Sequence, residues 1–257
     1  MSDNKYLKKQ EIVDYPGKKL PVVFLIDVSS SMNACEGGVP TGRTEFSDGV
    51  QWNIVEGGHS IMQDLLERVQ DFHDAMKDDR KASITCQTAY VTFGDDARMI
   101  EDFGIVKNKK APIDKLEAGD NETYIVKGIK KALQLLDEQK KLIRDEGGDY
   151  YQPWLIIFTD GQAHDDSYEI QSIKNELKSR QHSQKLTVYT MALNDDPNLY
   201  QQLRGYSIYK PIPFDKNKNE LNKFFSFLKK SISSISNNKI KGAVSGFTEM
   251  DDTSSLQ

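Results

Sequence analysis

Two apolar segments that each end in an aspartate most constrain how this chain can fold. Residues 20–27 read Leu-Pro-Val-Val-Phe-Leu-Ile-Asp, and residues 154–160 read Trp-Leu-Ile-Ile-Phe-Thr-Asp. Continuous apolar runs, rather than alternating ones, are typical of strands buried on both faces, as in a parallel sheet covered by helices. The two segments therefore predict two core strands of one sheet, with Asp27 and Asp160 at their carboxyl ends.

The segments around these strands alternate between helical and extended patterns. Apolar spacings of three and four predict helices, whereas short apolar runs bounded by turn residues predict strands. The predicted helices cover residues 54–76, 125–143, 167–180, 197–203 and 221–235, and the further strands cover 82–93, 97–103 and 186–193. This order predicts an α/β fold, a doubly wound and mostly parallel central sheet with helices on both faces and one antiparallel edge strand.

Composition predicts one folded unit with two polar ends. The 257 residues are 37% hydrophobic and 28% charged, as in an ordinary globular protein. Residues 1–19 are rich in lysine, and residues 237–257 are rich in Ser, Asn, Asp and Gly. We therefore expect an N-terminal arm at 1–19, a domain at 20–236 and a flexible acidic tail at 237–257.

The sequence also limits the location and the partners. Its longest strongly apolar run, residues 22–26, is far shorter than the roughly 20 residues that cross a bilayer, and the N-terminus lacks the apolar core of a signal peptide. We expect a cytoplasmic protein with no membrane partner. A net charge of -5 offers no broad positive surface for nucleic acid, and Cys35 and Cys86 cannot supply four thiolates to a zinc site.

Oxygen-bearing side chains gather where the two core strands end. Asp27, Ser29 and Ser31 alternate after the first strand, so one carboxylate and two hydroxyls can point to the same side of a tight turn. Asp160 adds a second carboxylate, and Thr123, before a predicted helix, adds a third hydroxyl. Taken alone, Ser and Asp at strand ends are most often turn formers. Together these oxygens suit a hard cation, and we expect Mg²⁺, with Mn²⁺ or Ca²⁺ as alternatives.

These separated motifs resemble the metal-ion-dependent adhesion site (MIDAS) of von Willebrand factor type A (vWA) domains. The family's Asp-x-Ser-x-Ser is matched by Asp27, Ser29 and Ser31, its loop threonine by Thr123, and its Thr-Asp-Gly aspartate by Asp160. The resemblance covers residues 20–236. It implies that the first four residues bind the metal directly or through water, and that Asp160 does so mostly through water.

Within the family, the chain looks most like bacterial cytosolic TerY/YegL-type proteins, which are linked to tellurite resistance and stress response. The likeness rests on residues 20–22, 53–62 and 150–154. It implies a scaffold that acts beside protein kinase and phosphatase partners.

Three features depart from the family's usual pattern. Ser30 stands where the family often has glycine. Residues 33–51 form a longer loop than usual before the first helix, and we expect this insertion to shape or cover the binding face. The loop before Thr123 reads Gly-Asp-Asn-Glu, which leaves Asp120 and Glu122 as alternative ligands.

The leading hypothesis is a protein-protein interaction module rather than an enzyme, in which the metal keeps one position open for an Asp or Glu of a partner protein. Two aspartates only just neutralise a divalent ion, so an incoming carboxylate gains a strong electrostatic contact. The alternative is a magnesium-dependent phosphohydrolase or phosphotransferase. Aspartate-nucleophile phosphatases resemble Asp-x-Asp, however, and Ser29 cannot serve as the general acid that the second aspartate provides.

Overall fold

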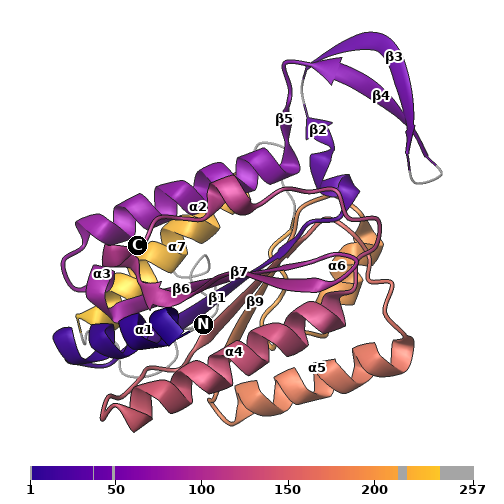
Figure 1. Cartoon of the computed structure of the whole chain (residues 1–257). Coiled ribbons are helices and arrows are strands. Elements are labelled where there is room, and N and C mark those ends of the chain that lie inside the picture. The colour runs from indigo at the N-terminus through magenta and orange to yellow at the C-terminus, as the bar shows by residue number, and fades with distance from the viewer. Residues whose placement is uncertain (1, 37, 48–49, 214–218, 238–257) are drawn as a thin grey trace, which may run out of the picture.

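The computed structural model describes residues 2–36, 38–47, 50–213 and 219–237. Its centre is a five-stranded sheet in the order β7-β6-β1-β8-β9 (Figure 1). Four strands are parallel, and β7 pairs antiparallel with β6 at the edge. The strands are β1 (Leu20–Asp27), β6 (Cys86–Phe93), β7 (Ala97–Ile105), β8 (Trp154–Thr159) and β9 (Thr187–Ala192). The predicted mostly parallel sheet with one antiparallel edge strand is confirmed.

Helices cover both faces of this sheet, with α2 and α7 on one side and α4 and α5 on the other (Figure 1). None of the helices in the described ranges is long and apolar enough to cross a membrane. The helices are α1 (Ser2–Asp14), α2 (Ile61–Asp78), α3 (Ala82–Thr85), α4 (Ile125–Asp145), α5 (Ser167–His182), α6 (Pro197–Leu203) and α7 (Asn219–Ser236).

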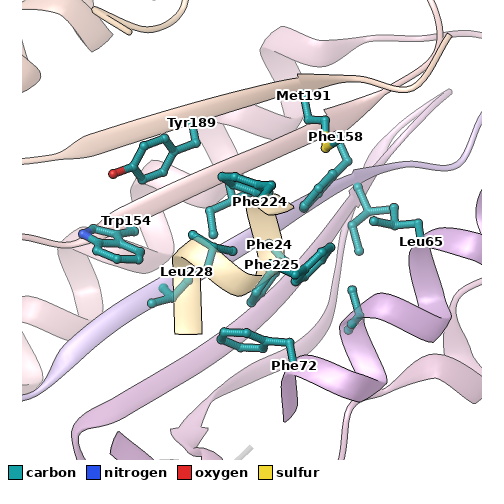
Figure 2. Close-up of a cluster of buried hydrophobic side chains, with 14 of the residues drawn as sticks. Phe24, Leu65, Phe72, Trp154, Phe158, Tyr189, Met191, Phe224, Phe225 and Leu228 are labelled. Atoms are coloured by element: carbon teal, nitrogen blue, oxygen red, sulfur yellow. The ribbon is translucent and has the colours of Figure 1, made fainter. Parts of the chain in front are cut away.

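Aromatic side chains hold the first helical layer on the sheet. The ring of Phe24 in β1 stacks 5.2 Å from Tyr90 in β6 and 6.3 Å from Phe158 in β8, measured between centroids. Phe72 of α2 meets Phe24 edge-on at 5.5 Å, and Phe225 of α7 stacks on Phe158 at 5.8 Å (Figure 2). These contacts fix β1 between β6 and β8, which brings the carboxyl ends of the strands together.

On the opposite face, a glycine lets α4 approach the sheet closely. A methyl group at Gly128 would lie 2.8 Å from Cβ of Phe93 and 3.0 Å from Cδ1 of Leu25. Any side chain there would push α4 away from β1 and β6. Gly128 therefore sets the position of the amino end of α4 and of the loop that precedes it.

The N-terminal segment differs from the weakly ordered arm that its composition suggests. Residues 2–14 form α1, in which Ile12 is buried against Leu142 and Ile143 of α4. The Glu11 carboxylate accepts a hydrogen bond of 2.9 Å from the backbone N–H of Ile105 in β7. One apolar and one acidic side chain thus dock α1 on the domain. The expected tail at 237–257 lies outside the described residues beyond Asn237.

The first helix begins later than its apolar spacing predicts. Ile54 belongs to strand β4 (Val50–Glu56), and α2 begins at Ile61. Gly57 breaks the strand with a φ of +79°, and Ser60 then caps the helix in a reciprocal pair of hydrogen bonds with Gln63. Placing Ile54 in the helix was wrong because its spacing to the true helix is coincidental.

Most of the expected loop at 33–51 is instead part of a folded extension, which we call the arm (residues 34–60, described except for 37 and 48–49). It contains β2 (Cys35–Glu36) paired with β5 (His59–Ser60) at its base, and β3 (Val39–Ser47) paired with β4. Both pairs are antiparallel. The β3–β4 hairpin projects away from the domain (Figure 1).

We expect Phe24→Ala to lower the free energy of unfolding by about 3–5 kcal/mol, because it removes a fully buried ring and leaves a cavity among its neighbours. The matched control is Phe46→Ala in β3, where the ring is 74% exposed, and its effect should stay within about 0.5 kcal/mol. Urea denaturation followed by circular dichroism measures both. Equal losses in the two variants would contradict the described core.

Candidate metal site

The site lies where two neighbouring parallel strands end. Ile26 of β1 pairs with Phe158 of β8, so Asp27 and Asp160 leave the sheet at the same edge. After β1 the chain runs to α2 on one face, and after β8 it runs to α5 on the other. Ligands of open α/β sheets bind at such a topological switch point.

A chain of hydrogen bonds connects the two aspartates. The backbone N–H of Ser29 donates to Oδ1 of Asp27 at 2.8 Å, and the hydroxyls of Ser29 and Ser31 lie 3.1 Å apart. The Ser31 hydroxyl then donates to Oδ1 of Asp160 at 2.9 Å. Thr159, which the sequence analysis did not single out, donates its hydroxyl to Oδ2 of Asp27 at 2.5 Å. Four of the five predicted ligands therefore form one cluster.

The surroundings of Gly161 place Thr123, the fifth predicted ligand, next to this cluster. A methyl group at Gly161 would lie 3.2 Å from Oγ1 of Thr123 and 3.8 Å from Oδ2 of Asp27. The three loops that carry the predicted ligands thus meet at a residue with no side chain. We call Asp27, Ser29, Ser31, Thr123 and Asp160 the oxygen cluster.

Backbone contacts hold the Thr123 loop against the Asp27 loop. The N–H of Ser30 donates to the carbonyl of Asp120 at 2.7 Å. Oδ1 of Asp95 accepts hydrogen bonds from the N–H groups of Asn121 at 3.1 Å and Glu122 at 2.9 Å. Asp95 sits in the turn between β6 and β7. It also positions the loop that presents Thr123.

Comparison with known proteins agrees with this architecture. Residues 22–207 match the family model of the von Willebrand factor type A domain. The chain belongs to this family. No curated protein sequence matches the chain. Helix α7, which follows the matched range, completes the vWA core through Phe224 and Phe225.

Several solved structures share the vWA fold at low sequence identity. The PilB minor pilin from Streptococcus sanguinis is 15% identical with a TM-score of 0.57, and the match covers 84% of this chain and 62% of the pilin. The pilus adhesin SpaC from Lactobacillus rhamnosus GG, in its open conformation, is 12% identical with a TM-score of 0.58, over 84% of this chain and 30% of the adhesin. The vWF domain of the type V pili tip protein Mfa5 from Porphyromonas gingivalis is 11% identical with a TM-score of 0.55, over 89% of this chain and 99% of that domain. At these identities the likeness establishes the fold.

The two alternative ligands are engaged by other groups in this vWA domain. The Asp120 carboxylate lies 3.0 Å from Nη2 of Arg98 and accepts from the N–H of Asp95 at 3.1 Å. Oε2 of Glu122 lies 2.8 Å from Nδ1 of His164. These contacts favour the original ligand set over Asp120 or Glu122.

His164 contacts the loop that carries Thr123. Its backbone N–H donates to the carbonyl of Thr123 at 3.0 Å. His164 therefore fixes the backbone of Thr123 from the loop that follows Asp160. Asp166 caps α5, because its carboxylate accepts from the N–H of Tyr168 at the start of this helix.

The electrostatics of the oxygen cluster favour a cation. Asp27 is 0% exposed and Asp160 is 4% exposed. Burial raises the pKa of Asp27 to about 6, and burial together with the charge of Asp27 raises the pKa of Asp160 to about 7. Among the described residues, neither carboxylate forms an ion pair with a Lys, Arg or His side chain. Two buried carboxylates and three hydroxyls fit a hard divalent ion such as Mg²⁺.

We expect Asp160→Asn to stabilise the chelator-treated protein at pH 8. A carboxyl whose pKa is higher in the folded state than its ordinary value near 3.8 loses stabilisation as pH rises, here from about 4 to about 7. Removing one charge should therefore raise the melting temperature at pH 8, with a smaller gain at pH 5.

Mg²⁺ should raise the melting temperature of the wild type at pH 8 but not that of Asp160→Asn. Asp114→Asn, at an exposed position, is the control and should follow the wild type. Thermal denaturation at both pH values makes the comparison. A variant that is less stable than the wild type in chelator at pH 8 would refute the repulsion between the two aspartates.

Proposed function

We propose that this vWA domain is a metal-dependent protein-binding module in which Asp27, Ser29, Ser31, Thr123 and Asp160 hold Mg²⁺. The observation that carries the proposal is the pair of buried carboxylates, bridged by serine hydroxyls at the carboxyl edge of the sheet. Mn²⁺ or Ca²⁺ would suit the same oxygen ligands.

Residues of this chain set the charge of the site and the orientation of its ligands. When bound, Mg²⁺ supplies a cation that can accept one more oxygen ligand, and the charges of Asp27 and Asp160 balance it without excess. Ser29 and Thr159 each donate a hydrogen bond to Asp27, which keeps its carboxylate oriented. An Asp or Glu of a partner protein would then complete the coordination, and loss of the metal would release that partner.

Two considerations support a cytoplasmic scaffold as the setting. Cys35 is exposed and Cys86 is buried, and neither forms a disulfide, as is usual for proteins of reducing compartments. The resemblance to TerY/YegL-type proteins points to a bacterial stress-response system, with tellurite resistance as the example and with kinases or phosphatases as partners. The pilus proteins of similar fold are named for extracellular structures. Fractionation of source cells decides between these locations.

We expect a partner to be retained from source cytosol by the wild type in Mg²⁺, but not in excess chelator and not by Asp27→Asn under either condition. The substitution keeps the size of the side chain while removing the charge that the metal needs. Asp114→Asn serves as the matched control and should retain the partner in Mg²⁺. Circular dichroism verifies that all three proteins are folded. Retention of the same protein in every sample would place recognition outside the oxygen cluster.

The proposal also predicts that the domain is not a phosphatase. Ser29 stands where aspartate-nucleophile phosphatases carry a second aspartate, and its hydroxyl is too weak an acid for that role. We expect p-nitrophenyl phosphate hydrolysis in Mg²⁺ to be equal for the wild type and Asp27→Asn. Metal-dependent turnover that disappears in Asp27→Asn would instead support the phosphohydrolase alternative.

A further inference from the structure

A second group of metal-binding side chains lies at the base of the arm. His59 belongs to β5, and Asp64 and Glu67 follow in the first turns of α2. Nδ1 of His59 lies 3.5 Å from Oε1 of Glu67 and 3.7 Å from Oδ1 of Asp64. One ligand atom from each of the three residues lies within 4.8 Å of the other two. We call these residues the histidine cluster.

The spacing within the histidine cluster matches shared coordination better than direct pairing. Ordinary N–H···O hydrogen bonds join atoms about 2.7–3.2 Å apart, which is closer than either nitrogen–oxygen distance here. A tetrahedral zinc ion with bonds of about 2.0–2.2 Å holds its ligand atoms about 3.3–3.6 Å from one another. The observed 3.5 and 3.7 Å are close to this spacing, and all three ligand atoms lie within 4.8 Å of one another.

The backbone already places the three side chains together. His59 pairs with Glu36 in the β2–β5 ladder, and the reciprocal cap between Ser60 and Gln63 fixes how β5 enters α2. Asp64 and Glu67 are three residues apart, so they share one face of the helix. An ion would therefore have to order only side chains and not the backbone.

The histidine cluster is accessible to an ion from solvent. The His59 side chain is 58% exposed, whereas that of Asp64 is 14% exposed. His59 and Glu67 also line a groove of about 560 Å³ between the arm, α2 and residues 113–114. Oε2 of Glu67 lies 3.3 Å from Nη2 of Arg68, so one oxygen is held while Oε1 faces His59.

We propose that His59, Asp64 and Glu67 form a second metal site that takes Zn²⁺ or a similar imidazole-binding divalent ion. One imidazole nitrogen with two carboxylates favours zinc over magnesium, which prefers oxygen ligands alone. The two carboxylates match the charge of the ion, and water would complete the coordination. A bound ion would tie β5 to α2 and so fix the base from which the β3–β4 hairpin projects. None of its three residues belongs to the oxygen cluster.

The test is a zinc titration of the full chain by calorimetry, in the wild type and in an Asp27→Asn background that removes a ligand of the oxygen cluster. Both should bind a zinc ion at the histidine cluster with similar affinity. His59→Gln should weaken this binding by on the order of tenfold or more, because it removes the only nitrogen ligand of the cluster. His182→Gln, at an exposed position in α5, is the matched control and should bind like the wild type.

Cobalt provides an independent readout. Co²⁺ in the wild-type protein should show visible absorption bands typical of nitrogen and oxygen coordination, and these bands should be lost in His59→Gln but kept in His182→Gln. Circular dichroism confirms the fold of each variant. Unchanged zinc affinity or an unchanged cobalt spectrum in His59→Gln would overturn the proposal. Loss of zinc binding in Asp27→Asn alone would assign the zinc to the oxygen cluster and would equally overturn it.

Discussion

The close approach of two buried carboxylates is the constraint on which the site depends. Aromatic packing places β1 next to β8, and this pairing brings Asp27 and Asp160 to one edge of the sheet. Serine and threonine hydroxyls and one backbone N–H donate to the two carboxylates, which offsets part of the cost of burying them. These neutral donors cannot cancel the charge. The remaining electrostatic cost favours binding of a proton or a cation, and pH and metal concentration decide between them.

Small residues make this convergence possible. Gly128 lets α4 lie close to β1 and β6, which places the Thr123 loop beside the end of β1. Gly161 leaves open the space next to Thr123 and Asp27. Asp95 then holds the backbone just before Thr123, and His164 holds the carbonyl of Thr123, both through hydrogen bonds. The position of Thr123 therefore depends on residues from three other segments of the chain.

The sheet and the oxygen cluster were predictable because their signals are local. A buried parallel strand needs a continuous apolar run, and Asp27, Ser29 and Ser31 occupy one short turn. Asp160 was predictable from the apolar run that it ends, whereas Thr123 alone resembles an ordinary loop residue and was assigned to the site with the help of the family resemblance. Contacts between residues far apart in the chain could not be predicted from the sequence. The docking of α1 depends on Glu11 meeting an amide of β7, and the second role of Asp95 depends on a loop 26 residues away.

The arm shows why a correct period can still mislead. Ile54 falls at a helical spacing from Ile61 and yet lies in β4, because Gly57 and Gly58 separate the two elements. The pair Ser60 and Gln63 is a capping box that marks the true start of α2 in the sequence. Apolar periodicity shows which face of a helix is buried, whereas a capping motif shows at which residue the helix begins. Helix boundaries are therefore better taken from caps.

Contacts at the base of the arm link the orientation of the arm to the geometry of the oxygen cluster. Ser31 lies in the short 3₁₀ helix Ser30–Asn33, directly before the arm begins. The N–H of Ile61 donates to the carbonyl of Ala34 at 3.1 Å, which closes the arm at its base, and the Asn33 side chain donates to the carbonyl of Ala118 at 3.1 Å. A rotation of the arm would therefore act on the helix that carries Ser31, and movement of Ser31 would act on the arm. An isolated two-stranded hairpin is at best marginally stable in water. The β3–β4 hairpin therefore depends on the contacts at this base. Ordering of the base thus affects both the oxygen cluster and the hairpin beside it.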